Sequence, residues 1–323
     1  MHSVLDDPEE VEFQRLFFPS VLERLTEIHA RDGKFVHYTS AEGAMGIIQS
    51  KSIWMRNAVT MNDYSEIEHG LKCLSFALKD EPVGGRLKKI LNDVHAGAWD
   101  ALTAAYDRWL PNMRANTYLT SVSEHLASED DNGRLSMWRA YGSTRGVALV
   151  LNLTPFAASS DALGANSHPV EYADEAQFSK SFARIVDNVE GSIELIASRQ
   201  PDWIIDCLLT VFRYATLCTK HPGFAEEREW RVIYSPMIMK SPVINQSIRA
   251  ISGVPQVIQS IPLIDSPIDG LVGADLNGLI HRLIIGPSQD RFALWQAFVS
   301  LLDDAGVDSS FRRVHASGIP LRT

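Results

Sequence analysis

The sequence has little cysteine, no excess of positive charge and no long hydrophobic run, and each shortage excludes a class of protein. Its 323 residues hold only three cysteines, Cys73, Cys207 and Cys218, and no two of them form a Cys-x-x-Cys pair. A disulfide framework and a cysteine-based zinc site are therefore not indicated, and buried reduced thiols are expected. Lysine and arginine number 30 against 40 aspartates and glutamates, a net charge of −10. This balance argues against binding nucleic acid by charge alone, although a local basic cleft stays open.

Neither a membrane span nor a secretory signal is predicted. The longest apolar stretch, from Trp203 to Cys218, is interrupted by Asp206 and Arg213 and falls short of the ~20 apolar residues that a span needs. The first ten residues are acidic and lack the basic and apolar regions of a signal peptide. We therefore expect a cytoplasmic protein that does not associate with membranes.

Common nucleotide, hydrolase and metal motifs are also missing. The chain contains no G-x-G-x-x-G, no G-x-x-x-x-G-K-[ST], no H-E-x-x-H and no G-x-S-x-G. The range 142–146 resembles a phosphate loop only superficially, and a turn before a strand explains it better. No two of the ten histidines have metal-ligand spacing, so no metal centre is expected.

The apolar periodicity predicts an α+β protein of one elaborated domain. With 45% hydrophobic and 22% charged residues, the chain has the composition of a folded globular protein. Helices are expected at 9–29 (with a break at Pro19), 41–50, 65–110, 175–199, 202–219 and 291–303. Strands are expected at 34–38, 52–56, 116–123, 146–151, 168–172, 227–234, 281–285 and 310–315. We divide the domain into a helical segment at 1–33, a core at 34–240 with a helical insertion at about 65–115, and a strand-helix-strand extension at 241–323.

Two carboxylates close in sequence are the strongest candidates for chemistry. In the expected strand 227–234, the period of two places Glu227 and Glu229 on one face beside Arg231, about 7 Å apart. Two interpretations are open. One is a solvated edge strand in which Glu and Arg form pairs. The other is a catalytic Glu-x-Glu, in which one carboxylate stabilises developing positive charge while the other orients a nucleophile.

Three further clusters each have a structural and a functional interpretation. His37 ends a short strand and precedes Thr39 at a helix start, which fits either a structural histidine beside a helix cap or a grip on ribose or phosphate. The range 117–123 is rich in hydroxyl groups, for which strand structure is a sufficient explanation. Trp138 and Tyr141 lie three residues apart on an expected short helix, where core packing is the simpler explanation.

Taken together, these pieces resemble an uncharacterised bacterial domain family. The resemblance covers most of the chain from about residue 34, and is weakest at 65–115. Its motifs are His37-Tyr-Thr, Asn62-Asp63 with Glu66, Ser121-x-Ser-Glu124, Met137-Trp138-x-x-Tyr141-Gly142, Glu227-Arg-Glu229-Trp-Arg231 and Ile284-Ile-Gly-Pro287. The order of a histidine, a serine-rich strand and a Glu-x-Glu is also similar to the three-part signature of the ADP-ribosyltransferases. That resemblance implies a split mixed or antiparallel sheet elaborated with helices.

The ADP-ribosyltransferase resemblance implies NAD as a substrate and gives roles to particular residues. Glu229 would be the catalytic glutamate that binds the ribose 2′-hydroxyl, and Glu227 would orient or deprotonate the acceptor. Breaking the nicotinamide–ribose bond builds an oxocarbenium ion, which a fixed carboxylate in a dry cleft stabilises. The remaining residues implied to bind NAD are His37 and Thr39 at the adenosine-side ribose and backbone, Thr120, Ser121 and Ser123 on the strand that carries the nicotinamide ribose, Tyr38 or Tyr141 stacked on nicotinamide, and Arg56 or Arg139 at the pyrophosphate.

Three functions follow as alternatives. The first is an enzyme that transfers ADP-ribose from NAD to a protein or nucleic-acid acceptor, in bacterial toxin or antiphage defence. The second is an NAD glycohydrolase, in which water is the acceptor. The third is a nucleotide-sensing or interaction module on the same scaffold, without turnover. The enzyme hypotheses require His37, Ser121 and Glu229 to line one cleft.

Overall fold

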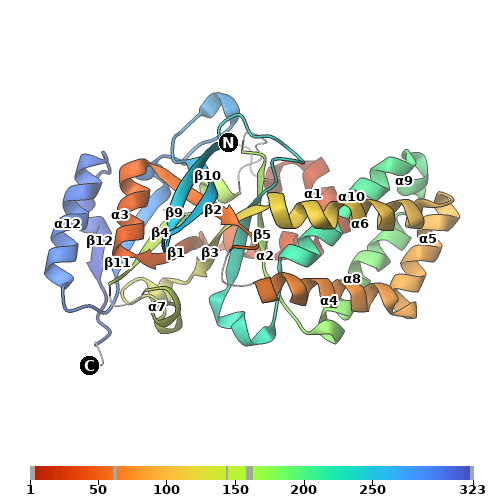
Figure 1. Ribbon diagram of the computed structural model, residues 1–323, viewed down its shortest axis with the longest axis horizontal. Helices are drawn as coiled ribbons and strands as arrows, with labels where there is room; N and C mark the ends of the chain where they lie inside the picture. Colours follow the sequence, from red (N-terminus) through yellow and green to blue (C-terminus); the bar gives the residue numbers. More distant parts are fainter. Residues whose placement is uncertain (1–3, 61–63, 143–144, 158–162, 321–323) are drawn as a thin grey trace.

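The protein combines a large mixed sheet with many helices, as the α+β prediction states (Figure 1). The computed structural model describes residues 4–60, 64–142, 145–157 and 163–320. Its helices are α1 (Pro8–Phe17), α2 (Pro19–Ala30), α3 (Ala41–Ser50), α4 (Tyr64–Lys79), α5 (Arg86–Val94), α6 (Ala98–Asn116), α7 (Leu135–Tyr141), α8 (Glu175–Gly191), α9 (Ile193–Ser198), α10 (Pro201–Leu217), α11 (Leu276–Leu279), α12 (Arg291–Asp304) and α13 (Ser310–Arg313). Its strands are β1 (Lys34–Ser40), β2 (Ser52–Asn57), β3 (Tyr118–His125), β4 (Gly146–Asn152), β5 (Ala165–Pro169), β6 (Glu171–Tyr172), β7 (Thr219–Lys220), β8 (Glu229–Tyr234), β9 (Asn245–Ile251), β10 (Val254–Pro262), β11 (Ile280–Ile285) and β12 (Val314–Ala316).

Short helical turns link several of these elements. The turns are η1 (Val4–Asp6), η2 (Glu81–Gly85), η3 (Ala127–Glu129), η4 (Thr154–Phe156), η5 (Pro222–Glu227) and η6 (Pro267–Asp269). Local sequence explains where the main helices begin. The Ser40 hydroxyl accepts a hydrogen bond from the Gly43 amide at 3.1 Å and so caps α3, while Asp7 caps α1 in the same way. Pro19 ends the first helical run and starts α2 as its first residue, which confirms the predicted break.

Ten of the described strands form one sheet in the order β12-β11-β4-β1-β3-β2-β10-β9, with β8 and β5 branching from β3. All pairs in this sheet are antiparallel except β11 with β12. A second, two-stranded sheet pairs β6 with β7 in parallel. The sheet is therefore mixed, and it forks at β3.

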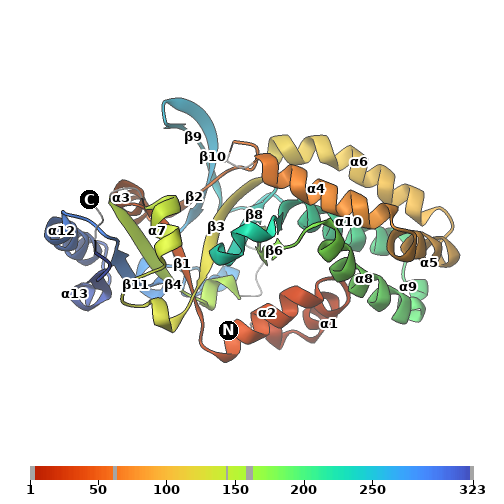
Figure 2. The same ribbon diagram turned by 90° about the horizontal axis from the view of Figure 1, so that it is seen from below.

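Helices cover both faces of the sheet and also form a lobe of their own. The helices α3 and α12 pack on one face of β4 and β11 through Ile48, Leu149 and Leu302, and α7 covers the other face through Trp138. The helices α4, α5, α6, α8, α9 and α10 gather at the other end of the molecule with α1 (Figure 1, Figure 2), where a separate apolar core unites them. The part of the chain that the structure describes has no helix long and apolar enough to cross a membrane.

Most of the predicted elements are confirmed, and the exceptions lie at strand ends and in the C-terminal third. The predicted strand 310–315 is wrong in its first part, because residues 310–313 form α13 and pairing with β11 begins only at Val314. The predicted strand 168–172 is divided into β5 and β6. The hairpin β9–β10, which projects from the sheet in Figure 2, is not predicted. The Asn62-Asp63 motif and positions 143–144 of the predicted turn lie outside the described residues.

Candidate functional site

The fork in the sheet opens a cleft between β1 and β3. Strand β1 pairs with β3 only as far as Val36, opposite Ser123, and β2 joins β3 only at Leu119, opposite Arg56. Between these points, none of the described strands pairs with this side of β3. The cleft at this gap has a volume of about 390 Å³, within the range of about 300–1,000 Å³ usual for small-molecule sites. It is lined by ten of the eleven predicted site residues, namely His37, Tyr38, Thr39, Arg56, Thr120, Ser121, Ser123, Tyr141, Glu227 and Glu229.

His37 spans the gap between the two strands. Its Nδ1 lies 2.9 Å from the carbonyl oxygen of Ser121, and because a carbonyl only accepts, Nδ1 carries the proton in this hydrogen bond. Burial lowers the pKa of His37, so the imidazole is neutral at pH 7 and Nε2 is its acceptor. The interpretation of His37 as a structural histidine thus holds for Nδ1, which bonds to Ser121. The ring of His37 nevertheless lines the cleft.

Glu229 is a buried, ionised carboxylate on the cleft floor. Its Oε1 accepts hydrogen bonds from Ser121 Oγ at 2.5 Å and from Arg231 Nε at 2.9 Å. Burial by itself would raise the pKa of Glu229, but the charges of Arg231 and Lys220 and the hydrogen bonds from Arg231 and Ser121 lower it to about 2. The carboxylate therefore keeps its charge and position at physiological pH.

Strand β8, which carries Glu229, lies inside the sheet and not at its edge. It pairs with β3 on one side and with β5 on the other, and Glu229 and Arg231 are only 7% and 5% exposed. The interpretation of this segment as a solvated edge strand is therefore wrong.

Lys220, which the sequence analysis does not single out, joins the acidic residues of the cleft. It ends β7, and its side chain is only 3% exposed. Its Nζ lies 2.6 Å from Glu66 Oε1, 2.6 Å from Glu227 Oε2 and 3.4 Å from Glu229 Oε2. Burial opposes the charge on Lys220, but the surrounding carboxylates raise its pKa. One ammonium group thus bridges three carboxylates that come from three different elements.

The buried charges of the cleft do not balance. Glu66, on α4, forms ion pairs with both Lys220 and Arg231, so three carboxylates share two cations. Burial raises the pKa of Glu66, and its two cationic neighbours only oppose that rise. The cluster has an excess of one negative charge when every group is ionised, which favours a positively charged group bound beside it.

Glu227 reaches the cleft by a route different from the predicted one. It is the last residue of η5, Arg228 has a left-handed backbone with φ 45°, and β8 begins only at Glu229. Strand alternation therefore does not place the two carboxylates on one face. Instead, the turn directs Glu227 to Lys220 and to Tyr141, whose hydroxyl donates to Glu227 Oε1 at 3.1 Å.

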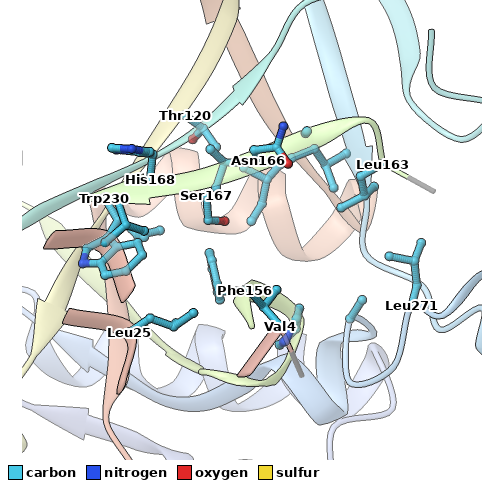
Figure 3. Close-up of a pocket in the computed structure, with 18 of the residues that line it drawn as sticks. Val4, Leu25, Thr120, Phe156, Leu163, Asn166, Ser167, His168, Trp230 and Leu271 are labelled. Atoms are coloured by element: carbon cyan, nitrogen blue, oxygen red, sulfur yellow. The ribbon is translucent and has the colours of Figure 1, made fainter. Parts of the chain in front are cut away.

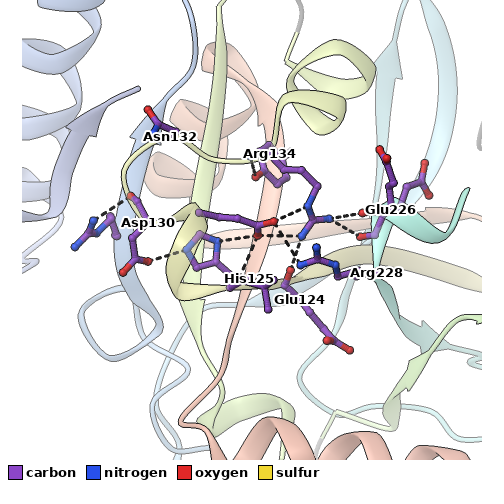
Figure 4. Close-up of polar contacts among 12 residues, drawn as sticks. Glu124, His125, Asp130, Asn132, Arg134, Glu226 and Arg228 are labelled. Carbon is purple, nitrogen blue, oxygen red and sulfur yellow. Dashed lines mark hydrogen bonds and ion pairs between the residues drawn. The ribbon is translucent and has the colours of Figure 1, made fainter. Parts of the chain in front are cut away.

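The turn that carries Glu227 is fixed by Arg134 (Figure 4). Arg134 Nη1 donates to the carbonyl oxygens of Glu226 and Glu227 at 2.6 and 3.1 Å, and Nη2 donates to that of Glu124 at 2.8 Å. Its Nε donates to Glu129 Oε1 at 2.9 Å. A guanidinium with its donors in a rigid fork can make all these bonds at once. Arg134 thereby ties the η5–β8 turn to the end of β3.

The two aromatic candidates for nicotinamide stacking, Tyr38 and Tyr141, differ in how far they are exposed to solvent. Tyr38 is buried in an edge-on contact with Trp138, at 4.8 Å between ring centres, and its hydroxyl accepts the Arg134 backbone N–H at 2.8 Å. Burial raises its pKa to about 12. Tyr141 is 45% exposed at the cleft. Core packing thus explains Trp138 and Tyr38, whereas Tyr141 is partly exposed where it lines the cleft.

Two other predictions need correction, and one residue that was not predicted joins the cleft. Arg139 is exposed on α7 and does not line the cleft, because it lies on the helix face away from Met137. Thr120 lines the cleft, but it pairs with Val232, so its side chain points to the face opposite Ser121. Trp54, unpredicted and 40% exposed, also lines the cleft. None of the described residues form a group of three or more that could hold a metal ion.

Comparison with known proteins adds a family similarity over part of the chain. Residues 137–232 match a family described as a protein of unknown function, DUF2971. This range runs from α7 into β8, so it contains Tyr141, Lys220, Glu227, Glu229 and Arg231. It fits the expected resemblance to an uncharacterised family. No curated protein and no solved structure shows significant similarity to the chain.

Proposed function

We propose that the cleft binds NAD as a substrate and transfers its ADP-ribosyl group to a protein or nucleic-acid acceptor. One observation carries the proposal. Glu229 is held as a carboxylate on the cleft floor by Ser121 and Arg231, and His37 lies across the gap with its Nδ1 bonded to the same Ser121 residue. The histidine, the serine-rich strand and the glutamate of the ADP-ribosyltransferase signature thus line one cleft. The forked sheet also supports the finer proposal of an ADP-ribosyltransferase-like fold.

The electrostatics of the cleft suit the reaction. When the bond between ribose C1′ and the nicotinamide nitrogen breaks, its electron pair leaves with nicotinamide and positive charge develops on the ribose. The ionised Glu229, within a cluster of three carboxylates and two cations, would stabilise that cation. No solvent reorganisation is needed, because the carboxylate is already fixed.

The remaining parts of NAD find partners farther from Glu229. Arg56 lines the cleft on β2, and its guanidinium, which donates to Thr60 O at 2.8 Å, would meet the pyrophosphate. Tyr141 would stack on nicotinamide. Glu227, whose side chain is 16% exposed against 9% for Glu229, lies nearer to solvent and would orient the acceptor.

Nicotinamide release from NAD tests the proposal. We expect Glu229→Gln to lower the release rate by about 100-fold or more, the usual effect of removing one preorganised electrostatic group. Glu226→Gln is the matched control, because Glu226 is exposed and does not line the cleft; its rate should stay within about twofold of the wild type. Thermal unfolding of both variants checks that each is folded.

Product analysis separates this function from its alternatives. Label from NAD on protein or nucleic acid supports the transferase, whereas free ADP-ribose alone identifies a glycohydrolase. Calorimetric binding of NAD without any release of nicotinamide would identify a sensing module. Wild-type release rates in Glu229→Gln would remove Glu229 from the mechanism.

A further inference from the structure

A second cavity lies on the opposite face of the same strands. Residues paired across β3, β8 and β5 share a face, so Thr120, Val232 and Ser167 form one row there. These three side chains face away from Glu229 and Arg231 and line a cavity of about 350 Å³. The cavity is therefore separate from the charged cluster, although His37, Thr120 and Val122 line both spaces.

Most of the residues that line this cavity are apolar, and the polar ones among them are Glu10, Gln14, His37, Thr120, Asn166, Ser167, His168 and Thr210. Figure 3 shows Ser167 on the strand side, with Phe156 and Leu25 facing it from the other side. None of the described residues that line it is a lysine or an arginine. Glu10, the acidic residue among the described residues of the lining, accepts a hydrogen bond from Gln14 at 2.8 Å. An anionic ligand would find no cation here, and burying an unpaired charge is strongly unfavourable.

Two hydroxyl groups interrupt the apolar floor. Among the described residues, neither Thr120 nor Ser167 has a side-chain hydrogen bond, and both line the cavity on either side of Val232. A hydroxyl both donates and accepts. The pair would therefore recognise one uncharged polar group, such as a hydroxyl or a carbonyl.

We infer that this cavity, which we call the back cavity, binds a neutral and mainly apolar small molecule with a polar group that meets Thr120 and Ser167. Its volume of about 350 Å³ is more than twice that of the ~150 Å³ apolar cavity that holds benzene. A medium-length aliphatic alcohol or a two-ring aromatic compound fits that description. The inference is independent of NAD turnover, because it depends on the other face of β8.

Fluorescence of the neutral probe N-phenyl-1-naphthylamine tests this inference. We expect saturable binding at one site per chain and displacement by decan-1-ol. Displacement by decanoate at pH 8 should need a concentration at least tenfold higher than displacement by decan-1-ol, since the carboxylate charge would be unpaired in the cavity. Binding that does not saturate, or equal displacement by decanoate and decan-1-ol, would overturn the inference.

Cavity-filling variants locate the probe. Ser167→Phe, on the edge strand β5, should raise the dissociation constant of the probe at least tenfold, because the ring fills the cavity and the hydroxyl is lost. The matched control is Ser247→Phe on β9, which is also an edge strand but does not line the cavity; it should bind as the wild type does. If Ser167→Phe does not fold, Leu22→Trp on α2 fills the cavity from a half-buried position. Wild-type affinity in the folded filling variant would refute the site.

Discussion

The two faces of β8 are almost equally buried but are stabilised by different interactions. Glu229 and Arg231 on one face are 7% and 5% exposed, and Trp230 and Val232 on the other are 1% and 7% exposed. The first pair depends on ion pairs with Glu66 and Lys220, whereas Trp230 packs against Phe35 with 5.2 Å between ring centres. A charged residue can be buried as fully as an apolar one, provided that other elements supply its partners.

This difference has a consequence for mutation. On the charged face each group is held by several others, so the loss of one partner leaves the remaining charges buried without compensation. On the apolar face each contact contributes separately, and the loss of one bond leaves the rest intact. The following predictions test this contrast.

The largest effect is expected for Lys220→Met. The substitution keeps the volume but leaves Glu66, Glu227 and Glu229 with a single buried cation, and removing one partner of a buried pair costs about 3–5 kcal/mol. Urea unfolding measures the loss. The control is Lys89→Met, since Lys89 forms an exposed ion pair with Asp93, and exposed pairs contribute little to stability, so this variant should unfold almost as the wild type does. Equal losses in the two variants would contradict a special role for the buried cluster.

Acid should weaken the charged face selectively. The pKa of Glu229 falls from 4.5 to about 2 on folding, so the unfolded chain binds more protons between these values. Its contribution to stability is thus complete above pH 4.5 and is lost as the pH falls toward 2, by on the order of 3 kcal/mol. The free energy of unfolding, measured by urea titration at each pH, should fall less steeply in Glu229→Gln than in the wild type. Parallel curves would show that Glu229 does not have a lowered pKa.

Among the three buried positions, the smallest effect is expected for Trp230→Phe on the apolar face. The ring contact with Phe35 persists, but the hydrogen bond from Trp230 Nε1 to Glu124 Oε1 at 2.9 Å is lost. Arg31 still holds Glu124, at 3.0 Å, so the lost hydrogen bond and the smaller buried ring together should cost about 1–2 kcal/mol in unfolding free energy. Trp54→Phe, at a 40% exposed position, should change stability by less. A loss from Trp230→Phe as large as that from Lys220→Met would break the contrast between the faces.

Periodicity predicted the elements whose burial is regular. Strand β4 is an apolar run that is buried along nearly all its length, and α3 begins at Ala41 as predicted, directly after its cap Ser40. The hairpin β9–β10 was missed because half of its strand residues are exposed, most of them on β9, so burial imposes no regular apolar alternation on its sequence. Its Ser252-Gly253 turn, with φ of 50° and 81°, was the one local signal.

The sequence predicted most residues of the candidate site, but it did not predict how all of them are arranged. His37, Ser121 and Glu229 stood out by residue type and order, and they line one cleft. The alternation rule failed for Glu227, because the left-handed Arg228 ends η5 before the strand begins. Lys220 gave no signal, since a single lysine beside a turn looks like any exposed lysine. Its role depends on α4 and η5 meeting at β7.

The sequence by itself determined the secondary-structure pattern, the net acidity and the pair of glutamates near Trp230, because these depend on residue type and on neighbours in the chain. Only the tertiary structure decided that Glu229 is buried and ionised. Burial by the elements packed around Glu229 raises its pKa, whereas the charges of Arg231 on its own strand and of Lys220, with a hydrogen bond from Ser121 108 residues away, lower it. The tertiary structure also decided that one strand borders a charged cleft on one face and an apolar cavity on the other, because the fork in the sheet brings different elements to each face.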